Sequence, residues 1–590
     1  MAPLHTTGEL KIATVIQRVA ECERNLVAGA PNVRIAILRD FTAEQLVPYV
    51  KYHCFAEGIA GTITLGRYDS IQDELIDESS FIQRDGTEIV VVAMHSSTEE
   101  LSEPDGLSRR EAKVVSVLTA IRQFVQRNSA IVVVTTLVTP IHEAAGLSAP
   151  LARRWVARIE AINRTIKEIG DEAPGRLFVI DSDRLVRQLG WARAIDARSE
   201  MKFKAPFRAA FYDAIARDLM RIVYSLKGRS RKCVVLDCDN TLWGGVIGDD
   251  GLDGIELDPG SFPGSAYYQF QQNLLRLKER GVLLAIASKN DEANVLEVLE
   301  RHPHSVLRPT DFATWQINWE RKSENVARIA TTLNVLSDAL VFVDDNAAEL
   351  HDVTESLPGV LSVLVPTHDI ATLPTLLLDL PQLDQLHVSN EDTSRSEFFQ
   401  KERLRDNIRA SFVSQEEYLA ALEIHAVVHE VRPSEIQRVA QLTQKTNQFN
   451  LTTHRYAESE IARLADASDC AVFTLTARDR FGDYGLTGVF IARRENDRGT
   501  VDSLLMSCRI LSRRLEHALV RHAIEDLTKR WDLREWRADY IRTAKNGIVA
   551  DYWPTAGFAV METSGDRVEY RLDVSEANWT DTSFIEVAND

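Results

Sequence analysis

The sequence has 590 residues, too many for one hydrophobic core, and this length predicts three or four domains. An apolar content of 45% and a charged content of 26% are ordinary for a soluble globular protein. The formal net charge of −19 argues against nucleic acid or an anionic membrane as a partner bound through bulk charge, although it excludes no small anionic substrate.

The cysteines and the hydropathy pattern predict a compartment. Six cysteines are scattered along the chain without CxxC or metal-ligand spacing, which suits a reducing environment better than a disulfide framework. No apolar stretch approaches the roughly 18–20 residues of a membrane span, and no apolar signal segment opens the sequence. We therefore expect a cytoplasmic protein without a membrane partner.

Apolar strands alternate with helical patterns in the first part of the chain. Such alternation is typical of a doubly wound α/β domain, which we place over residues 1–228. The predicted strands are 33–38, 88–94, 130–137 and 177–181, and two of the predicted helices are 109–127 and 151–169.

The same alternation returns in a second α/β domain, predicted over residues 229–385. Its predicted strands are 233–237, 282–287, a short 305–307, 340–344 and 360–365, and its helices lie near 265–280, 291–301, 322–333 and 346–355.

The remainder of the chain has a different pattern. A polar stretch over 386–414 predicts a linker helix, and mixed strands and helices predict an α+β domain over 415–562. Residues 563–590 are polar and are expected to form a loosely attached tail. The strands of the α+β domain are predicted at 470–476, 487–493 and 501–507, and its helices at 432–444 and 513–529.

The most informative segment is 233–245, which reads CVVLDCDNTLWGG. A buried strand ends there in Asp237 and Asp239, two carboxylates that repel each other and lose water. Such groups persist mainly where a cation or a reaction uses them. The alternative is an ordinary strand followed by an Asp/Asn turn.

Three other polar groups lie in the same predicted domain. Ser288-Lys289-Asn290 follows the strand 282–287, Lys322 begins the helix 322–333, and Asp344-Asp345 comes at the end of the strand 340–344. Each alone is explained by a turn, a helix cap or a solvated charge. Because the carboxyl ends of parallel strands meet at one edge, we expect these groups to come together. The aspartates would offer the oxygen ligands that suit Mg²⁺, while Ser288 would donate to a phosphoryl oxygen and Lys322 would neutralise its charge.

In this order the groups resemble the four motifs of the haloacid dehalogenase (HAD) superfamily: DxDxT, Ser, Lys, DD. The resemblance implies an Mg²⁺-dependent phosphatase-like enzyme with a Rossmann-like fold. The stretch between Thr241 and Ser288 has room only for a loop and one helix, so we expect no large cap domain and access for large substrates. The implied roles are Asp237 as nucleophile, Asp239 as acid/base, Thr241, Ser288, Lys289, Asn290 and Lys322 at the phosphate, and Asp237, the carbonyl of Asp239, Asp344 and Asp345 around the metal.

More specific blocks resemble the FkbH-like, or HAD-IIIC, branch of that superfamily. Members typically dephosphorylate 1,3-bisphosphoglycerate and load a glyceryl group onto an acyl carrier protein for polyketide assembly, and others sit beside surface-polysaccharide genes. The blocks are LDCDNTLWGGVIGDDG (236–251), ASKND (287–291), residues 319–325, FVDDNAAE (342–349), QLTQKTNQFNLTT (441–453), RDRFGDYGLTGVF (478–490), SCRILSRRLEHALV (507–520) and Lys545-Asn546.

Cys238 lies between the two aspartates, where a thiolate would be able to accept an acyl group. The surrounding carboxylates would raise its pKa while Mg²⁺ would oppose them. The alternative is a small buried residue at a strand end.

The outer domains resemble two further families. The C-terminal one is similar to the GNAT acyltransferases, but Ser512 and Arg514 fill glycine positions of the pyrophosphate loop and argue against ordinary coenzyme A binding. Arg513 and Arg514 would bind a phosphate or be solvated, and we favour the second; Asn447, Asn450 and the 482–488 loop are candidates for a carrier groove.

The N-terminal domain resembles SGNH hydrolases. Its first strand ends in Arg39-Asp40-Phe41, where an active hydrolase would have Gly-Asp-Ser, and no convincing Asp-x-x-His follows. A docking or structural role is therefore expected.

The sequence thus predicts an Mg²⁺-dependent enzyme that removes phosphate from a phosphorylated small acid and transfers the acyl group to an acyl carrier protein. A plain phosphatase of a sugar or glycerate intermediate, with an inert Cys238, is the first alternative. A non-catalytic scaffold is the second, and the intact four-motif set argues against it.

Overall fold

The computed structural model describes residues 12–26, 30–84, 86–97, 105–141, 155–386, 405, 408–409, 412, 414–495, 497–507, 510–511, 513–543 and 545–589. The chain divides into two compact units, Met1–Lys227 with Asp384–His387, and Gly228–Leu383 with Val388–Asp590. The fold is a mixed α/β arrangement with two parallel sheets, as predicted, and a third, mixed sheet. Most of the linker helix predicted over 386–414 lies outside the described residues.

The first unit is built on a parallel sheet with the order β2-β1-β3-β4-β5. The apolar runs IVVVA and IVVVT of β3 and β4 are buried on both faces, as a parallel sheet between helical layers requires. The strands are β1 (Asn32–Arg39), β2 (Ala60–Tyr68), β3 (Ile89–Ala93), β4 (Ile131–Thr135) and β5 (Leu177–Ile180).

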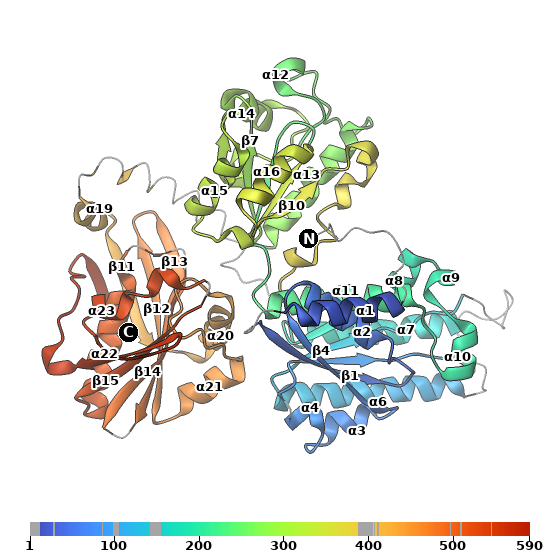
Figure 1. The fold of residues 1–590 in the computed structure, drawn as a ribbon, viewed down its shortest axis with the longest axis horizontal. Helices are drawn as coiled ribbons and strands as arrows, with labels where there is room; N and C mark the ends of the chain where they lie inside the picture. The colour runs from blue at the N-terminus through green and yellow to red at the C-terminus, as the bar shows by residue number, and fades with distance from the viewer. Residues whose placement is uncertain are drawn as a thin grey trace. The chain divides into compact units, whose positions relative to one another are not determined.

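Helices cover both faces of this sheet (Figure 1). Ile35 and Ile37 pack with α1, α2 and α11, while Ala36 and Leu38 pack with α3, α6 and α7. The edge strand β2 was not predicted, because its sequence AGTITLGRY is half exposed and lacks a continuous apolar run. The helices are α1 (Ile12–Arg24), α2 (Leu46–Ala56), α3 (Ile71–Ile76), α4 (Phe81–Arg84), α6 (Gly106–Arg127), α7 (Trp155–Glu168), α8 (Ser182–Leu189), α9 (Trp191–Ala194), α10 (Ala197–Phe203) and α11 (Ala209–Leu226).

The second unit begins with a parallel sheet of order β10-β9-β6-β7-β8. The predicted strand at 305–307 is wrong, because the Gln271 side-chain oxygen accepts the backbone N–H groups of Val306 and Leu307. The edge strand is instead β8, a few residues later. The strands are β6 (Cys233–Leu236), β7 (Leu283–Ser288), β8 (Phe312–Ile317), β9 (Leu340–Asp344) and β10 (Leu361–Leu364).

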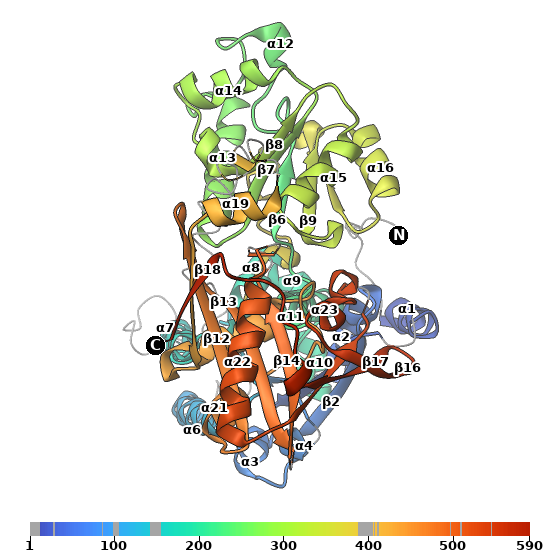
Figure 2. The same ribbon diagram turned by 90° about the vertical axis from the view of Figure 1, so that its left-hand side faces the viewer.

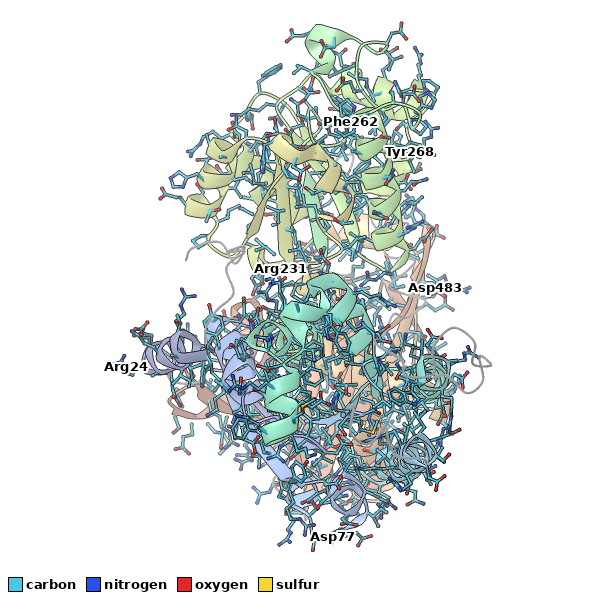
Figure 3. The ribbon with its side chains drawn as sticks, turned by 90° about the vertical axis from the view of Figure 1, so that its right-hand side faces the viewer. Arg24, Asp77, Arg231, Phe262, Tyr268 and Asp483 are labelled. Carbon is cyan, nitrogen blue, oxygen red and sulfur yellow. The ribbon has the colours of Figure 1, made fainter. Side chains whose placement is uncertain are left out.

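Alternate side chains of β6 enter opposite cores. Val234 and Leu236 pack with α13 and α14, and Cys233 and Val235 pack with α15 and α16. The segment between β6 and β7 contains only α12 and α13, so it holds no large cap. Phe262, labelled in Figure 3, is an exposed residue of this segment. The helices are α12 (Ile247–Asp250), α13 (Gly264–Glu279), α14 (Glu292–Arg301), α15 (Lys322–Thr332) and α16 (Ala347–Ser356).

The third sheet has the order β16-β17-β15-β14-β13-β12-β11-β18. Residues 563–590 are therefore no loose tail. β17 pairs with β15 and buries Tyr570 and Leu572, and β18 pairs with β11 and buries Ile585. The strands are β11 (Ile424–Glu430), β12 (Cys470–Asp479), β13 (Gly482–Glu495), β14 (Arg498–Met506), β15 (Glu535–Ile541), β16 (Ala559–Ser564), β17 (Arg567–Asp573) and β18 (Ile585–Asn589).

The long helix α22 lies across the middle strands of this sheet (Figure 2). The opposite face packs against α20 and α21. The helices are α19 (Gln415–Ala421), α20 (Ile436–Lys445), α21 (Glu458–Asp466), α22 (Leu515–Trp531) and α23 (Tyr552–Thr555). Within the described part of the chain, no helix has both the length and the apolar character needed to cross a bilayer.

Candidate active site

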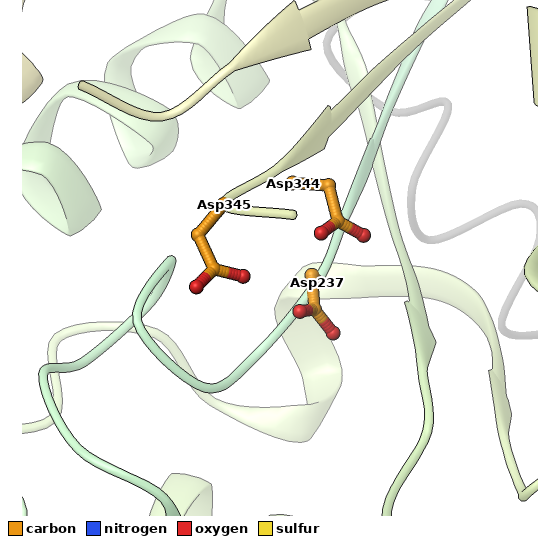
Figure 4. A group of neighbouring side chains, drawn as sticks. All are labelled: Asp237, Asp344 and Asp345. Atoms are coloured by element: carbon orange, nitrogen blue, oxygen red, sulfur yellow. The ribbon is translucent and has the colours of Figure 1, made fainter. Parts of the chain in front are cut away.

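Three aspartates from two neighbouring strands form the centre of the candidate site. Asp237 follows β6, Asp344 ends β9 and Asp345 comes next, and each offers a carboxylate oxygen within 4.8 Å of the others (Figure 4). The strands are adjacent and parallel, with Leu236 opposite Val343, and the Asp237 N–H donates to the Val343 carbonyl at 3.0 Å. The predicted convergence at the carboxyl edge is present in the structure.

Lys322 lies against this cluster from the first turn of α15. Its Nζ is 2.6 Å from Asp344 Oδ2 and 3.0 Å from Asp237 Oδ2, and the residue is 3% exposed. Burial disfavours the ammonium, but the two carboxylates outweigh burial and raise the pKa of Lys322. Lys322 thus remains a buried cation between two of the three acids.

The cluster keeps more negative charge than Lys322 neutralises. Burial, and then the charge of Asp237, raise the pKa of Asp344 to about 6, and the same two causes raise the pKa of Asp345. Three carboxylates and one ammonium carry a formal charge of −2 when all are ionised. This donor set of hard oxygens, with a surplus of two negative charges, fits Mg²⁺.

The Asp239 carboxylate makes a different set of contacts. Its Oδ1 accepts from Trp243 Nε1 at 2.9 Å and from the Ile247 backbone N–H at 3.1 Å, and its Oδ2 accepts from Asn290 Nδ2 at 2.9 Å. It is not one of the three carboxylates that share the metal position. Burial raises the pKa of Asp239, and nearby Asp237 adds to the rise against the opposing hydrogen bonds. Any contribution of Asp239 to the metal would come from its backbone carbonyl.

The loop after β6 makes a tight turn that presents these groups. Asn240 has a left-handed backbone with φ of 52°, and its Oδ1 accepts from the Gly245 N–H at 3.0 Å. Thr241 closes a turn that begins at Cys238, because its N–H donates to the Cys238 carbonyl. The turn brings Trp243, four residues after Asp239, back to the carboxylate. Sequence reasoning missed this role of Trp243, for which the i to i+4 spacing was the available signal.

Two buried hydroxyl residues lie at the predicted phosphate position. Thr241 is fully buried, and its Oγ1 has no hydrogen-bond partner among the described residues. Ser288 ends β7 and is 1% exposed. A buried hydroxyl without a partner is costly, so Thr241 Oγ1 is in a position to donate to a ligand oxygen, whereas Ser288 forms a side-chain hydrogen bond with Cys238.

Lys289 and Asn290, which are neighbours in the sequence, make different contacts. Lys289 Nζ forms a 2.6 Å ion pair with Glu349 Oε1 and stays partly exposed. Asn290 is buried and bonds Asp239 rather than facing solvent. The structure therefore places Asn290 against the Asp239 carboxylate and leaves Lys289 partly exposed.

Cys238 belongs to a hydrophobic core, and its thiol forms a side-chain hydrogen bond with Ser288. It is fully buried in the core that contains Leu236 and α13, and burial, followed by the charge of Asp237, raises its pKa well above that of an ordinary thiol. A buried neutral thiol is a weak nucleophile. The geometry does not support the acyl-acceptor role that its place in the sequence suggested.

The third sheet contains a gap that the chain itself fills. β14 and β15 pair in parallel near Thr500 and then separate, and residues 449–451 lie between them. Leu451 N–H donates to the Leu504 carbonyl at 3.2 Å, and Ile541 N–H donates to the Leu451 carbonyl at 2.8 Å. An extended ligand arm would need to displace this segment.

The motif residues around that gap are mainly structural. Asn450 is fully buried, and its carbonyl accepts from Asn546 Nδ2 at 3.0 Å. Asn447 Oδ1 accepts from Arg455 Nη2 at 2.7 Å. Asn447 also lines a pocket with Gln448 and Lys545, whereas Asn450 is fully buried, so a carrier groove at Asn447 stays a prediction.

Of the arginines described in the 509–514 stretch, Arg513 is buried and Arg514 is partly exposed. Arg513 is 6% exposed, with its guanidinium carbon 5.2 Å from the centre of the Tyr484 ring. Arg514 has a φ of 60° and forms a 3.1 Å ion pair with Glu416. Arg509 and Ser512 lie outside the described residues.

In the first unit, Asp40 is engaged by other side chains. It forms an ion pair with Arg110, lies 3.4 Å from Lys113 Nζ, and accepts the His95 N–H at 2.9 Å. His95 Nε2 in turn lies 3.0 Å from Glu200 Oε1, a pair that sequence reasoning missed. Asp40 thus serves as a buried anchor for the loops after β1 and β3.

Comparisons with known structures show a likeness of fold over more than half of this chain. The N-terminal part of BF1531 from Bacteroides fragilis, containing a phosphatase domain complexed with Mg, aligns with 64% of this chain and all of its own, at 23% identity and a TM-score of 0.56. At this identity the structural likeness shows a shared fold alone.

Acetyltransferase structures match a C-terminal part of the chain. They include the ribosomal-protein-S18-alanine N-acetyltransferase from Escherichia coli (15% identity, 26% of this chain, 96% of that chain, TM-score 0.21). PaiA N-acetyltransferase from Thermoplasma acidophilum, solved with coenzyme A, is similar at 13% identity over 25% of this chain and 98% of its own, with a TM-score of 0.21. A scan against protein-family models and a search of curated proteins each found no match.

Proposed function

We propose that the middle domain, residues 229–385, is an Mg²⁺-dependent phosphoryl-group enzyme of the HAD type, in its FkbH-like branch. The single observation that carries this proposal is the convergence of Asp237, Asp344 and Asp345 on one metal-sized position, with Lys322 buried against two of them. The shared fold with a phosphatase domain solved with Mg supports it.

The roles of the side chains follow from their contacts. An Asp237 carboxylate oxygen attacks phosphorus, the bond from phosphorus to the leaving-group oxygen breaks, and the phosphoryl group is held as an acyl phosphate on Asp237. Lys322 keeps the Asp237 carboxylate in place and offsets charge on the phosphoryl oxygens. Thr241 and Ser288 donate to those oxygens from buried positions.

Asp239 handles the proton in both halves of the reaction. It donates to the leaving oxygen, then accepts a proton from the water that hydrolyses the Asp237 acyl phosphate. Mg²⁺, held by the carboxylates of Asp237 and Asp345, with Asp344 beside them and the Asp239 carbonyl available, would supply charge neutralisation at the phosphoryl group.

For the substrate and partner, we propose a phosphorylated small acid, with 1,3-bisphosphoglycerate the choice favoured by the family resemblance, and an acyl carrier protein as acyl acceptor. In the transfer, the carrier thiolate attacks the C1 carbonyl carbon, the bond from that carbon to the phosphate oxygen breaks, and phosphate leaves. The Asp237 chemistry removes the C3 phosphate. Because Cys238 is buried and its pKa is raised by burial, we assign the accepting thiol to the carrier protein and not to Cys238. The GNAT-like and SGNH-like outer domains would then dock the carrier or support the fold.

A plain phosphatase is the second candidate. The filled gap between β14 and β15 favours it, since an acyl arm would enter there only by displacing residues 449–451. In that case the same Asp237 chemistry ends with release of both products to water.

One incubation separates these candidates. The full chain is mixed with labelled 1,3-bisphosphoglycerate, Mg²⁺ and an acyl carrier protein, and intact masses are measured, with Asp237→Asn as the control. A glyceryl adduct on the carrier supports transfer, and phosphate release without an adduct supports the phosphatase. Absence of phosphate release from any phosphorylated acid tested, together with an unchanged Tm on adding Mg²⁺, would contradict both.

A further inference from the structure

Asp239 is held by three donors that come from two different loops. Trp243 Nε1 and the Ile247 N–H belong to the loop after β6, and Asn290 Nδ2 belongs to the loop after β7. The two oxygens of the carboxylate are both engaged, Oδ1 by Trp243 and Ile247 and Oδ2 by Asn290. Such a set of contacts defines both the rotamer and the plane of the carboxylate.

The donors are themselves rigidly placed. Trp243 is fully buried, and Asn290 is 5% exposed. The Asn290 amide is oriented by its other end, because its Oδ1 accepts the Asp291 N–H at 2.9 Å and so leaves Nδ2 to face Asp239. Asp291 in turn caps α14 through the Ala293 N–H at 3.1 Å. The position of the Asp239 carboxylate therefore depends on packed elements on both sides.

The Asp239 carboxylate needs these donors because another negative charge lies close to it. Asp237 lies two residues before Asp239, and its carboxylate repels that of Asp239 at close range in a poorly solvated site. Without fixed donors the Asp239 side chain would turn toward solvent. Three directed hydrogen bonds hold it near the carboxyl edge and apart from the three-aspartate cluster.

We infer that Trp243 and Asn290 are positioning residues for Asp239, which hold its carboxylate where a leaving-group oxygen of the substrate can take its proton. This inference rests on the proposed function and adds to it the two side chains that aim the general acid. Neither needs to touch the substrate.

Removal of one donor should matter most for substrates that need a proton. A 4-nitrophenolate group leaves phosphorus without protonation, whereas the alkoxide of glycerol 3-phosphate must be protonated as it leaves. For Trp243→Phe, which keeps an aromatic ring and loses the N–H, we expect kcat with glycerol 3-phosphate to fall about tenfold more than kcat with 4-nitrophenyl phosphate. KM for both esters should change little.

Asn290→Asp keeps the acceptor for the Asp291 N–H and replaces the amide donor by a carboxyl group that competes with the leaving oxygen for the Asp239 proton, so it should shift the ratio of the two kcat values in the same direction. Trp315→Phe is the matched control, because Trp315 Nε1 donates to Glu292 Oε1 at 2.9 Å in the same domain but not to Asp239. It should leave the ratio as in the wild type. Equal losses with both esters in Trp243→Phe and Asn290→Asp would overturn the inference and leave these residues as supports of the fold.

A second measurement does not depend on turnover. In protein labelled with ¹⁵N-tryptophan, the indole N–H signal of Trp243 is identified by its loss in Trp243→Phe. Asp239→Asn should shift that signal, and Asp379→Asn, an exposed change in the same domain, should not. An unshifted signal would contradict the contact. If neither ester is hydrolysed by the wild type, the proposed function fails, while this spectrum still decides whether Trp243 and Asp239 are joined.

Discussion

Lys322 Nζ lies 2.6 Å from Asp344 Oδ2, and both side chains are almost completely excluded from solvent. In a buried ion pair each charge is stabilised by the other. Removal of one member strongly destabilises the fold, because the remaining charge stays buried. The pair therefore links the stability of the domain to its chemistry.

The first prediction concerns Lys322→Met, which keeps the length of the side chain and removes the charge. We expect a loss of about 3 kcal/mol in the free energy of unfolding, since Asp237 and Asp344 would remain buried without their cation. Urea unfolding, followed through the transition of the middle domain, measures this loss in the free energy of unfolding. Lys278→Met is the control: its partner Asp311 is 2.7 Å away but the lysine is 22% exposed, so the loss should stay below about 1 kcal/mol. Equal losses would show that the buried pair has no special weight.

The second prediction concerns the metal. Mg²⁺ that binds only the folded protein at about 100 times its Kd should stabilise it by about 2.7 kcal/mol, and the Tm should rise. In Asp345→Asn the rise should largely disappear, while the Tm without metal should increase because a repelling charge is gone. Asp379→Asn, an exposed aspartate of the same domain, should behave like the wild type. A full Mg²⁺ response in Asp345→Asn would remove Asp345 from the metal site.

The third prediction concerns the reactivity of Cys238. Because it is fully buried and burial raises its pKa, iodoacetamide at neutral pH should leave it unmodified in the folded protein. Peptide mapping by mass spectrometry reads the result. Cys22 and Cys470 are partly exposed and provide the internal comparison. Rapid alkylation of Cys238 ahead of these two would restore it as a candidate acceptor.

The fourth prediction concerns Glu516 in the first turn of α22. Burial raises its pKa from 4.5 to about 7, and its Oε2 has no hydrogen-bond partner among the described residues. Below pH 4.5 the residue is protonated in both the folded and the unfolded chain. Between pH 4.5 and 7 only the unfolded chain releases the proton, so stability falls as the pH rises, and above 7 the penalty is constant at about 3 kcal/mol.

Glu516→Gln removes that penalty without changing the shape of the side chain. Its Tm should exceed that of the wild type at pH 8, and the difference should vanish near pH 4.5. Calorimetry at the two pH values tests this. A difference that is the same at both pH values would mean that Glu516 is ionised in the folded protein at neutral pH.

Much of the candidate site was predictable because it depends on strand ends. Asp237 and Asp344 each follow a short apolar run, and parallel strands bring such ends to one edge whatever the details of packing. The resemblance to HAD motifs then associated Lys322 with them. The edge strand β8 was misplaced because Thr314 and Gln316 interrupt its apolar run, although most of the strand is buried.

Other features depended on contacts between distant segments. Residues 567–573 and 585–589 read as polar, yet they pair with β15 and β11 because backbone hydrogen bonds, and a few buried side chains such as Tyr570, suffice to add a strand. Pairing partners of this kind leave little trace in a local pattern.

By itself the sequence determined the α/β alternation, the strand that leads to Asp237 and the set of acidic and basic groups at the carboxyl edge, because local hydrophobic periodicity and strand direction are enough to place them. Only the tertiary structure decided which way Cys238 and Asp239 face. The Cys238 side chain continues the alternation of β6 and enters the core next to α13. The Asp239 carboxylate is held by donors on Trp243 and Asn290, which belong to separate loops. The orientation of a side chain depends on its neighbours in space, and those neighbours come from elsewhere in the chain.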